Sequence, residues 1–218
     1  MKVSVESIHS LDTRTRGQII LPGNGKYEEA RAIWNGIFDK EHILISKCET
    51  NEDVVESVNF ARENNLLLAV KGGGHNSAGT ASCDDGIMID LSLMQNISVD
   101  PQTGRAKVQG GCLLGDVDKA TQEHGLAVSA GIISHTGVGG LSLGGGLGWI
   151  SRKHGLTVDN MLSAEVVTAD GRVVKTSKDE NPDLFWAIRG GGGNFGVVTN
   201  FEFQCADIGT ELYSGPIV

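Results

Sequence analysis

The sequence feature that most constrains this chain is a run of three glycines and a histidine, Gly72-Gly73-Gly74-His75, placed directly after the apolar stretch Leu66–Val70. The apolar stretch predicts a buried strand. Consecutive glycines at a strand end leave backbone N–H groups accessible, and such groups are typical of phosphate-binding loops. The run therefore predicts a loop that binds a phosphate-bearing cofactor, with His75 as a ring that could tether it. Taken alone, the run fits a simple sharp turn equally well.

The residues around this run predict a small β-α-β unit. His42–Ser46 has the pattern of a short buried strand, and Thr50 has the position of an N-cap for an amphipathic helix over residues 51–64. Together with the strand over Leu66–Val70, this order predicts parallel strands joined by a right-handed crossover. The loop over residues 71–77 then lies at the carboxyl edge of the sheet, where open α/β sheets bind ligands.

The rest of the chain predicts a larger, mostly antiparallel part. Two hairpins are expected, one around the turn at residues 100–104 and one around Ala169-Asp170-Gly171, whose Asp-Gly pair is a strong hairpin signal. Before residue 40 the only signal is a helix around Tyr27–Asn35. The further predicted elements are strands over Gly86–Leu91, Ile97–Val99, Arg105–Val108, Ala164–Thr168, Arg172–Lys175 and Gly196–Phe203, and helices over Leu113–His124 and from Pro182 to Ile188.

Composition argues against several classes of partner. The net charge of −9, without a basic stripe, disfavours nucleic acid, because phosphate backbones are bound by clustered Lys and Arg. Four widely spaced cysteines, Cys48, Cys83, Cys112 and Cys205, indicate neither a metal site nor a disulfide framework. No apolar run approaches the roughly 20 residues of a membrane-spanning helix. The expected location is therefore the cytoplasm, with no membrane partner.

Glycine is unusually abundant and clustered, with 31 glycines among 218 residues. Residues 191–196 satisfy the spacing of a dinucleotide fingerprint, but a helix is predicted before them and a strand after them, which is the reverse of the order that the fingerprint needs. No phosphate-binding loop of the Walker type occurs. The glycines of residues 131–157 exceed what a turn requires, so the backbone there is expected to lie close to something flat or charged.

At this point the residues resemble a known family, the flavoproteins with a PCMH-type (vanillyl-alcohol-oxidase-like) FAD-binding domain, and within it the bacterial relatives of the berberine-bridge-enzyme-like oxidases. The resemblance covers about residues 40–208 in the family's order. It implies an α+β fold in which a small parallel β-α-β subdomain precedes a larger, mostly antiparallel one. The matching segments are GGGHN at 72–76, TGVGGL at 136–141, GGG at 144–146, RKHGLTVDN at 152–160, VTADG at 167–171 and RGGGGNFGVVT at 189–199.

The resemblance also implies the cofactor and its contacts. FAD is expected to be joined through a ring nitrogen of His75 to the 8α-methyl of the flavin, with the loop over 72–77 holding the pyrophosphate. The glycines of the second cluster would lie against the ring system, and Val197 would contact the adenine side. The implied cofactor-binding residues are Gly72, Gly73, Gly74, His75, Asn76, Ser77, Thr136, Gly137, Val138, Gly139, Gly140, Gly144, Gly145, Gly146, Gly148 and Val197.

Three positions refine this picture. Many family members form a second flavin bond through a cysteine, and in the register of the glycines that position is Ile133, so a single covalent bond is expected. In the same register, Val138 falls where relatives control the access of oxygen. His135 lies in the implied flavin loop and could hydrogen-bond the ring or the substrate, while a structural or solvated role remains the alternative.

The resemblance implies an oxidase that transfers a hydride from an alcohol, a sugar or a similar carbon centre to FAD and passes the electrons to oxygen. Residues 1–39 would be a lead-in, residues 40–208 the FAD-binding domain, with subdomains of about 40–95 and 96–208, and residues 209–218 the start of a substrate domain. Neither Tyr27 nor Tyr213 matches the family's catalytic base, so no catalytic residue is assigned. The alternatives are an incompetent FAD-binding fragment or half of a split protein, and a noncovalent reductase, which His75 disfavours.

Overall fold

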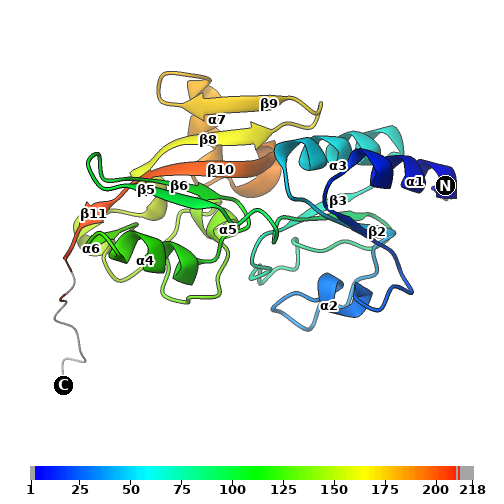
Figure 1. Cartoon of the computed structure of the whole chain (residues 1–218), viewed down its shortest axis with the longest axis horizontal. Coiled ribbons are helices and arrows are strands. Elements are labelled where there is room, and N and C mark those ends of the chain that lie inside the picture. Colours follow the sequence, from blue (N-terminus) through cyan, green and yellow to red (C-terminus); the bar gives the residue numbers. More distant parts are fainter. Residues whose placement is uncertain (1–2, 210, 212–218) are drawn as a thin grey trace.

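The computed structural model describes residues 3–209 and 211 and arranges them around two β-sheets (Figure 1). The first sheet has four strands in the order β1-β2-β4-β3, and the second has five in the order β5-β6-β10-β8-β9. The first sheet contains parallel and antiparallel pairs, whereas the second is antiparallel. The predicted α+β class, with a small parallel part before a larger antiparallel one, is confirmed.

The bounds of the elements follow the chain. In the first half they are α1 (Val5–Arg14), β1 (Gln18–Ile20), α2 (Tyr27–Arg31), β2 (Leu44–Lys47), α3 (Asn51–Glu63), β3 (Leu68–Lys71) and β4 (Ile87–Asp90). In the second half they are β5 (Ile97–Asp100), β6 (Arg105–Gln109), α4 (Leu114–Gln122), β7 (Leu126–Ala127), α5 (Val138–Leu143), α6 (Ser151–His154), η1 (Thr157–Asn160), β8 (Met161–Val167), β9 (Val173–Ser177), α7 (Pro182–Ile188), η2 (Gly192–Phe195), β10 (Val197–Gln204) and β11 (Ala206–Asp207).

Parallel pairing sets the geometry of the first sheet. β2 and β3 each pair in parallel with β4, so the strands of the predicted β-α-β unit are parallel, with β4 inserted between them. All four residues of β4 are buried, which is usual for a central parallel strand. The carboxyl ends of β2, β4 and β3 therefore meet at one edge. The glycine-histidine loop begins at this edge, directly after β3.

A single buried carboxylate connects α3 to the chain that enters the first sheet. Asp53 accepts hydrogen bonds from the backbone N–H groups of Arg16 (2.8 Å), Gly17 (3.2 Å), Glu49 (2.8 Å) and Thr50 (3.2 Å). The Thr50 hydroxyl in turn accepts a bond from the Asp53 N–H, which completes a capping box. One side chain thus orients the start of α3 and fixes the segment that leads into β1.

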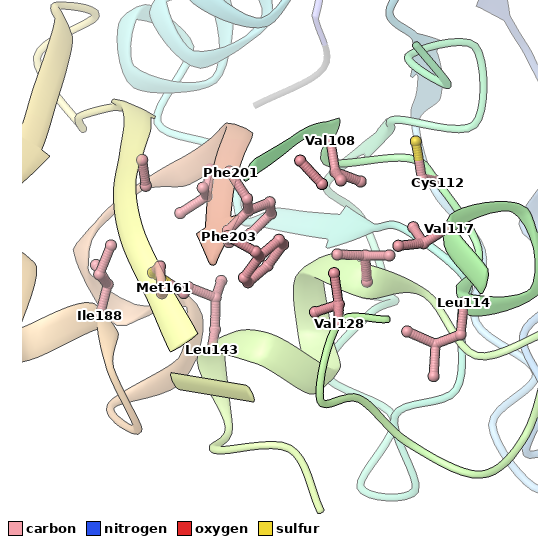
Figure 2. Packing of buried hydrophobic residues seen from close by; sticks show 14 of the residues in the cluster. Val108, Cys112, Leu114, Val117, Val128, Leu143, Met161, Ile188, Phe201 and Phe203 are labelled. Atoms are coloured by element: carbon pink, nitrogen blue, oxygen red, sulfur yellow. The ribbon is translucent and has the colours of Figure 1, made fainter. Parts of the chain in front are cut away.

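The second sheet carries the largest hydrophobic cluster. β10 lies at its centre, between β6 and β8, and its buried face presents Phe201 and Phe203, whose rings stack with centroids 5.7 Å apart. Figure 2 shows these rings together with Leu114 and Val117 of α4 and Leu143 of α5. Both predicted hairpins, β5–β6 and β8–β9, are confirmed. Each brings one strand beside β10.

A second cluster packs the two halves of the molecule together. Val54 and Val58 of α3 and Ile89 of β4 share this cluster with Val167, at the end of β8, and Val197, at the start of β10. α3 therefore packs against both sheets, as Figure 1 shows for its position between α1 and the strands of the second sheet. The two halves meet beside the strand ends that lead into the glycine loops.

The first forty residues depart most from the sequence prediction. The helix predicted over Tyr27–Asn35 ends at Arg31, because Ala32 turns to extended backbone. α1 and β1 were not predicted. α1 buries only Leu11 fully, and β1 has three residues, so neither carries an apolar period long enough to recognise.

Other boundaries shift less. The strand predicted from Leu66 begins at Leu68, and the glycine-rich stretch over residues 131–157, for which no element was predicted, contains α5 and α6. Gly125, which follows α4, has a left-handed conformation with φ of 68°. The domain division at residues 39/40 and 208/209 stays a prediction, and most of the last segment of that division, residues 210 and 212–218, lies outside the described residues.

None of the helices in the described part is long and apolar enough to cross a bilayer.

Replacing the buried carboxylate should test its role in the fold. We expect Asp53→Ala to lower the free energy of unfolding by about 3 kcal/mol, because four backbone N–H groups lose a charged acceptor. Urea denaturation followed by circular dichroism measures this change. Glu52→Ala, which removes the exposed carboxylate next to it in the same helical turn, should change stability by about 0.5 kcal/mol or less. Equal effects of the two variants would contradict the anchoring role.

Candidate cofactor site

A cavity of about 1080 Å³ lies between the two halves of the molecule. This volume is at the upper limit of ordinary small-molecule pockets, so the cavity can take a ligand as long as a dinucleotide. Its walls come from both sheets and from α3, α5 and η2. The lining residues include Val58, Ala61, Arg62, Leu66, Leu68, Val70, Gly72, Gly73, Gly74, His75, Asn76, Ser77, Thr136, Gly137, Gly139, Gly140, Gly144, Val167, Gly192, Gly193, Asn194, Val197 and Val198.

The cavity wall combines apolar side chains with glycine backbone. β3 runs along it, with Leu68 at the start of the strand and Gly72 just beyond its end. Apolar side chains of the wall include Val58 and Ala61 of α3 and Val197 of β10. Beyond the end of β3, glycine backbone and small polar side chains line the cavity. A ligand that has both apolar and charged parts fits this wall.

The loop after β3 offers a row of hydrogen-bond donors. Among the described residues, no hydrogen bond is donated by the backbone N–H groups of residues 73–77. Successive backbone N–H groups in a loop form a concave site for anions. Residues 72–77 all line the cavity, so these donors can bind a pyrophosphate as the sequence predicted.

The two glycine runs touch each other through their backbones. A Cβ added to Gly73 would lie 2.3 Å from the Gly137 nitrogen, and one added to Gly137 would lie 2.2 Å from the Gly73 nitrogen. No side chain fits at either position. The sequence interpretation explained these glycines by close approach of a cofactor, and at this pair the structure supplies a different reason: the loops pack against one another.

Other glycines of the cavity have no such reason. A Cβ on Gly140 or Gly193 would meet no protein atom within 4 Å, and neither residue has a positive φ. Both line the cavity. The protein itself could accommodate a side chain at these positions, so the space in front of them suits a bound group. FAD fits this observation.

An N-terminal segment holds the phosphate loop from outside. The Trp34 N–H donates to the Gly74 carbonyl (3.0 Å), and the Asn35 side chain donates to the Ser77 carbonyl (2.9 Å). The sequence analysis missed both residues, since they follow α2 in a stretch without a recognisable motif. It also missed the apolar wall, because Val58 and Ala61 have the spacing of an ordinary core face on α3.

Three rings meet at the histidine of the loop. His75 Nε2 lies 2.6 Å from His135 Nδ1, and the Trp34 ring stacks on the His75 ring with centroids 4.8 Å apart and planes 12° apart. Burial, followed by the nearby His135, lowers the pKa of His75 below the ordinary histidine value. The His75 ring is therefore neutral at physiological pH, which is the state of a nucleophile.

Four of the predicted site residues lie away from the cavity wall: Val138, Gly145, Gly146 and Gly148. Val138 is 2% exposed and packs in the main hydrophobic cluster, and its expected role in the access of oxygen stays a prediction. A Cβ on Gly148 would lie 1.5 Å from the Ala130 carbonyl oxygen, and one on Gly146 would lie 2.1 Å from Thr157 Oγ1. Local packing explains these two glycines.

The cysteines are not placed for a second flavin bond. All four lie within the described residues, and none lines the cavity. Burial raises the pKa of Cys48 and of Cys112 to about 12, so neither forms a thiolate readily. Ile133 is 45% exposed in the loop before Thr136. These positions agree with a single attachment point at His75.

Comparison with known proteins identifies the family. A family profile described as "FAD binding domain" matches residues 43–177. The chain belongs to this FAD-binding family. The match includes the loop over 72–77, His75 and the second glycine run, which are the parts of the cavity wall with polar chemistry.

Curated relatives of this FAD-binding chain are named as FAD-linked oxidoreductases or, for two of them, as oxidases. (R)-6-hydroxynicotine oxidase from Paenarthrobacter nicotinovorans is 41% identical over 200 residues, which are 92% of this chain and 44% of the relative. The chain thus spans less than half of the length of this relative.

Solved structures agree. 6-Hydroxy-D-nicotine oxidase from Arthrobacter nicotinovorans superposes with a TM-score of 0.86 at 42% identity, over 88% of this chain and 42% of that one. Glucooligosaccharide oxidase from Acremonium strictum gives a TM-score of 0.85 at 33% identity, over 91% of this chain and 42% of the other. The description of that structure names a 6-S-cysteinyl, 8α-N1-histidyl FAD.

Alanine substitutions at two glycines of the cavity should distinguish a glycine needed for loop packing from a glycine that leaves room for the cofactor. We expect Gly137→Ala to lower the free energy of unfolding of the flavin-free protein by about 2 kcal/mol, because its Cβ collides with the Gly73 backbone. Gly140→Ala should leave that stability unchanged, or raise it by up to about 1 kcal/mol through helix propensity. It should weaken FAD binding about tenfold, equivalent to about 1.4 kcal/mol.

Urea denaturation measures the stabilities, and flavin fluorescence titration in a His75→Ala background measures noncovalent FAD binding. The two glycines control for each other, since both belong to the same cavity wall. Unchanged FAD affinity in Gly140→Ala would contradict the placement of the cofactor.

Proposed function

We propose that this chain is the FAD-binding part of a flavin-dependent oxidase that takes a hydride from an alcohol, a sugar or a similar carbon centre and passes the electrons to oxygen. Membership of the FAD-binding family supports the cofactor. The reaction is supported by relatives that are named as oxidases of a hydroxynicotine and of glucooligosaccharides. Since the chain spans under half of these relatives, the activity and substrate belong to the proposal.

The observation that carries the proposal is the position of His75 in the wall of the cavity. The ring belongs to the loop over 72–77, is neutral at physiological pH, and has Trp34 stacked on it. A neutral imidazole in this place can bind FAD covalently, as the histidyl FAD of the glucooligosaccharide oxidase is bound. None of the four cysteines lines the cavity, which supports one bond and not two.

The remaining residues would bind and orient the cofactor. The N–H groups of residues 73–77 would hold the pyrophosphate, and the apolar part of the wall, which includes Val197, would hold the adenine. Gly140 and Gly193 would leave room for the cofactor against the backbone. When bound, FAD supplies the hydride acceptor, and the protein supplies position and surroundings.

The described residues do not offer a tyrosine as catalytic base. Tyr27 is buried, and its hydroxyl donates to the His42 carbonyl at 2.8 Å, away from the cavity. Burial raises the pKa of Tyr27. The alternative proposal is that the chain as given binds FAD without turning over substrate.

Substrate reduction separates the two proposals. The flavin-loaded protein, mixed anaerobically with a panel of sugars, alcohols and cyclic amines, should lose its flavin absorbance with at least one of them if the chain is a competent oxidase. Retention of the oxidised spectrum with every compound would support the FAD-binding fragment. Photoreduction of the same sample is the control, because it shows that the bound flavin can be reduced.

The attachment point has a direct test. We expect the protein produced with flavin to keep its yellow colour in the pellet after precipitation with trichloroacetic acid, and to gain the mass of one FAD. His75→Ala should lose the covalent flavin and keep some noncovalent FAD, since the phosphate loop is intact. His154→Ala, a histidine outside the cavity, is the matched control and should retain the bond. Colour that stays in the supernatant for the unaltered protein would contradict covalent attachment.

A further inference from the structure

His135 lies directly against the expected attachment histidine. Its Nδ1 is 2.6 Å from His75 Nε2, and the ring centroids are 4.6 Å apart. The two residues are 60 positions apart in the sequence, one after β3 and the other before α5. A ring-to-ring contact of this length is a hydrogen bond, so one nitrogen carries the shared proton and the other accepts it.

Only one direction of this hydrogen bond leaves His75 reactive. If His135 donated, His75 Nε2 would use its lone pair as acceptor and Nδ1 would carry the proton, so neither nitrogen could attack. If His75 Nε2 donates its proton to His135 Nδ1, the His75 Nδ1 lone pair is free. The geometry therefore connects His135 to the tautomer of His75.

We propose that His135 is a positioning residue for flavin attachment: it holds His75 with the proton on Nε2, leaves Nδ1 as the nucleophile, and accepts the Nε2 proton when the bond to the flavin forms. This inference rests on the covalent attachment proposed above. It also assigns the bond to Nδ1 of His75, since Nε2 is occupied by His135.

The overall step balances with dioxygen as the oxidant. One bond forms between His75 Nδ1 and the 8α carbon of the flavin. One hydrogen leaves the 8α methyl group and one leaves the imidazole, the latter as the Nε2 proton that His135 Nδ1 takes up. The two electrons released reduce dioxygen, which with two protons gives hydrogen peroxide.

Trp34 fixes the geometry of the pair. Its ring contacts both imidazoles, with centroids 4.8 Å from each, and its backbone N–H is bonded to the Gly74 carbonyl next to His75. The loop backbone and the His75 ring are therefore held by one residue. Rotation of His75 away from His135 would break the stack with Trp34 as well as the hydrogen bond.

The test follows the rate of covalent attachment and not oxidase activity. The 218-residue chain is produced in riboflavin-starved cells and mixed with FAD in air-saturated buffer, and the covalent fraction is measured by mass spectrometry of acid-quenched samples. His135→Leu removes the acceptor, and His135→Asn keeps an acceptor oxygen near the place of Nδ1. His124→Leu, an exposed histidine beyond α4, is the matched control.

We expect His135→Leu to attach FAD about 10²-fold more slowly than the unaltered protein and to bind FAD noncovalently with similar affinity. His135→Asn should be intermediate, since it preserves the tautomer but cannot take the proton, and added imidazole should speed attachment in His135→Leu. His124→Leu should attach at the normal rate. Nuclear magnetic resonance of the flavin peptide should locate the bond at Nδ1.

The outcomes separate this inference from the proposed function. Absence of covalent FAD in the unaltered protein would overturn the proposed attachment itself. Normal attachment in the unaltered protein together with an equal rate in His135→Leu, or a bond at Nε2, would overturn the role of His135 alone. A loss in His135→Leu that neither His135→Asn nor imidazole recovers would show a purely structural role and would likewise overturn the inference.

Discussion

The site depends on one backbone contact, the packing of Gly73 against Gly137. Because neither residue has a Cβ, the loop after β3 and the segment before α5 can come into direct backbone contact. A Cβ added to either glycine would lie within 2.3 Å of the backbone nitrogen of the other. His75 is two residues beyond Gly73, and His135 is two residues before Gly137. The contact of the two glycines therefore brings the two imidazoles together at 2.6 Å. It also joins the two halves of the cavity wall.

The cavity wall combines two chemistries because different parts of the fold contribute to it. The carboxyl end of β3 contributes backbone N–H groups without described partners, which suit the charged part of a dinucleotide. α3 and β10 contribute the apolar side chains of Val58 and Val197. Asp53 stabilises this arrangement indirectly, because it fixes the start of α3 against the chain that enters the first sheet.

Local patterns predicted most of the elements and the polar part of the site. Apolar period and the Thr50 cap located α3, and turn residues located the hairpins of the second sheet. The clustering of glycines pointed to the correct loops, although packing explains Gly73, Gly137 and Gly148 where cofactor contact was expected. α1, β1 and the Trp34 contact were missed, since each depends on neighbours that are distant in sequence.

The sequence by itself determined the FAD-binding family, the α+β class and the position of the glycine-histidine loop, with His75 as the expected attachment residue, because these depend on short runs of residues with defined backbone or side-chain chemistry. Only the tertiary structure decided which residues surround His75. Trp34, His75 and His135 come from three separate segments, and their contact arises from the packing of loops across the two sheets. No spacing along the chain encodes that contact, since it depends on how closely two backbones can approach.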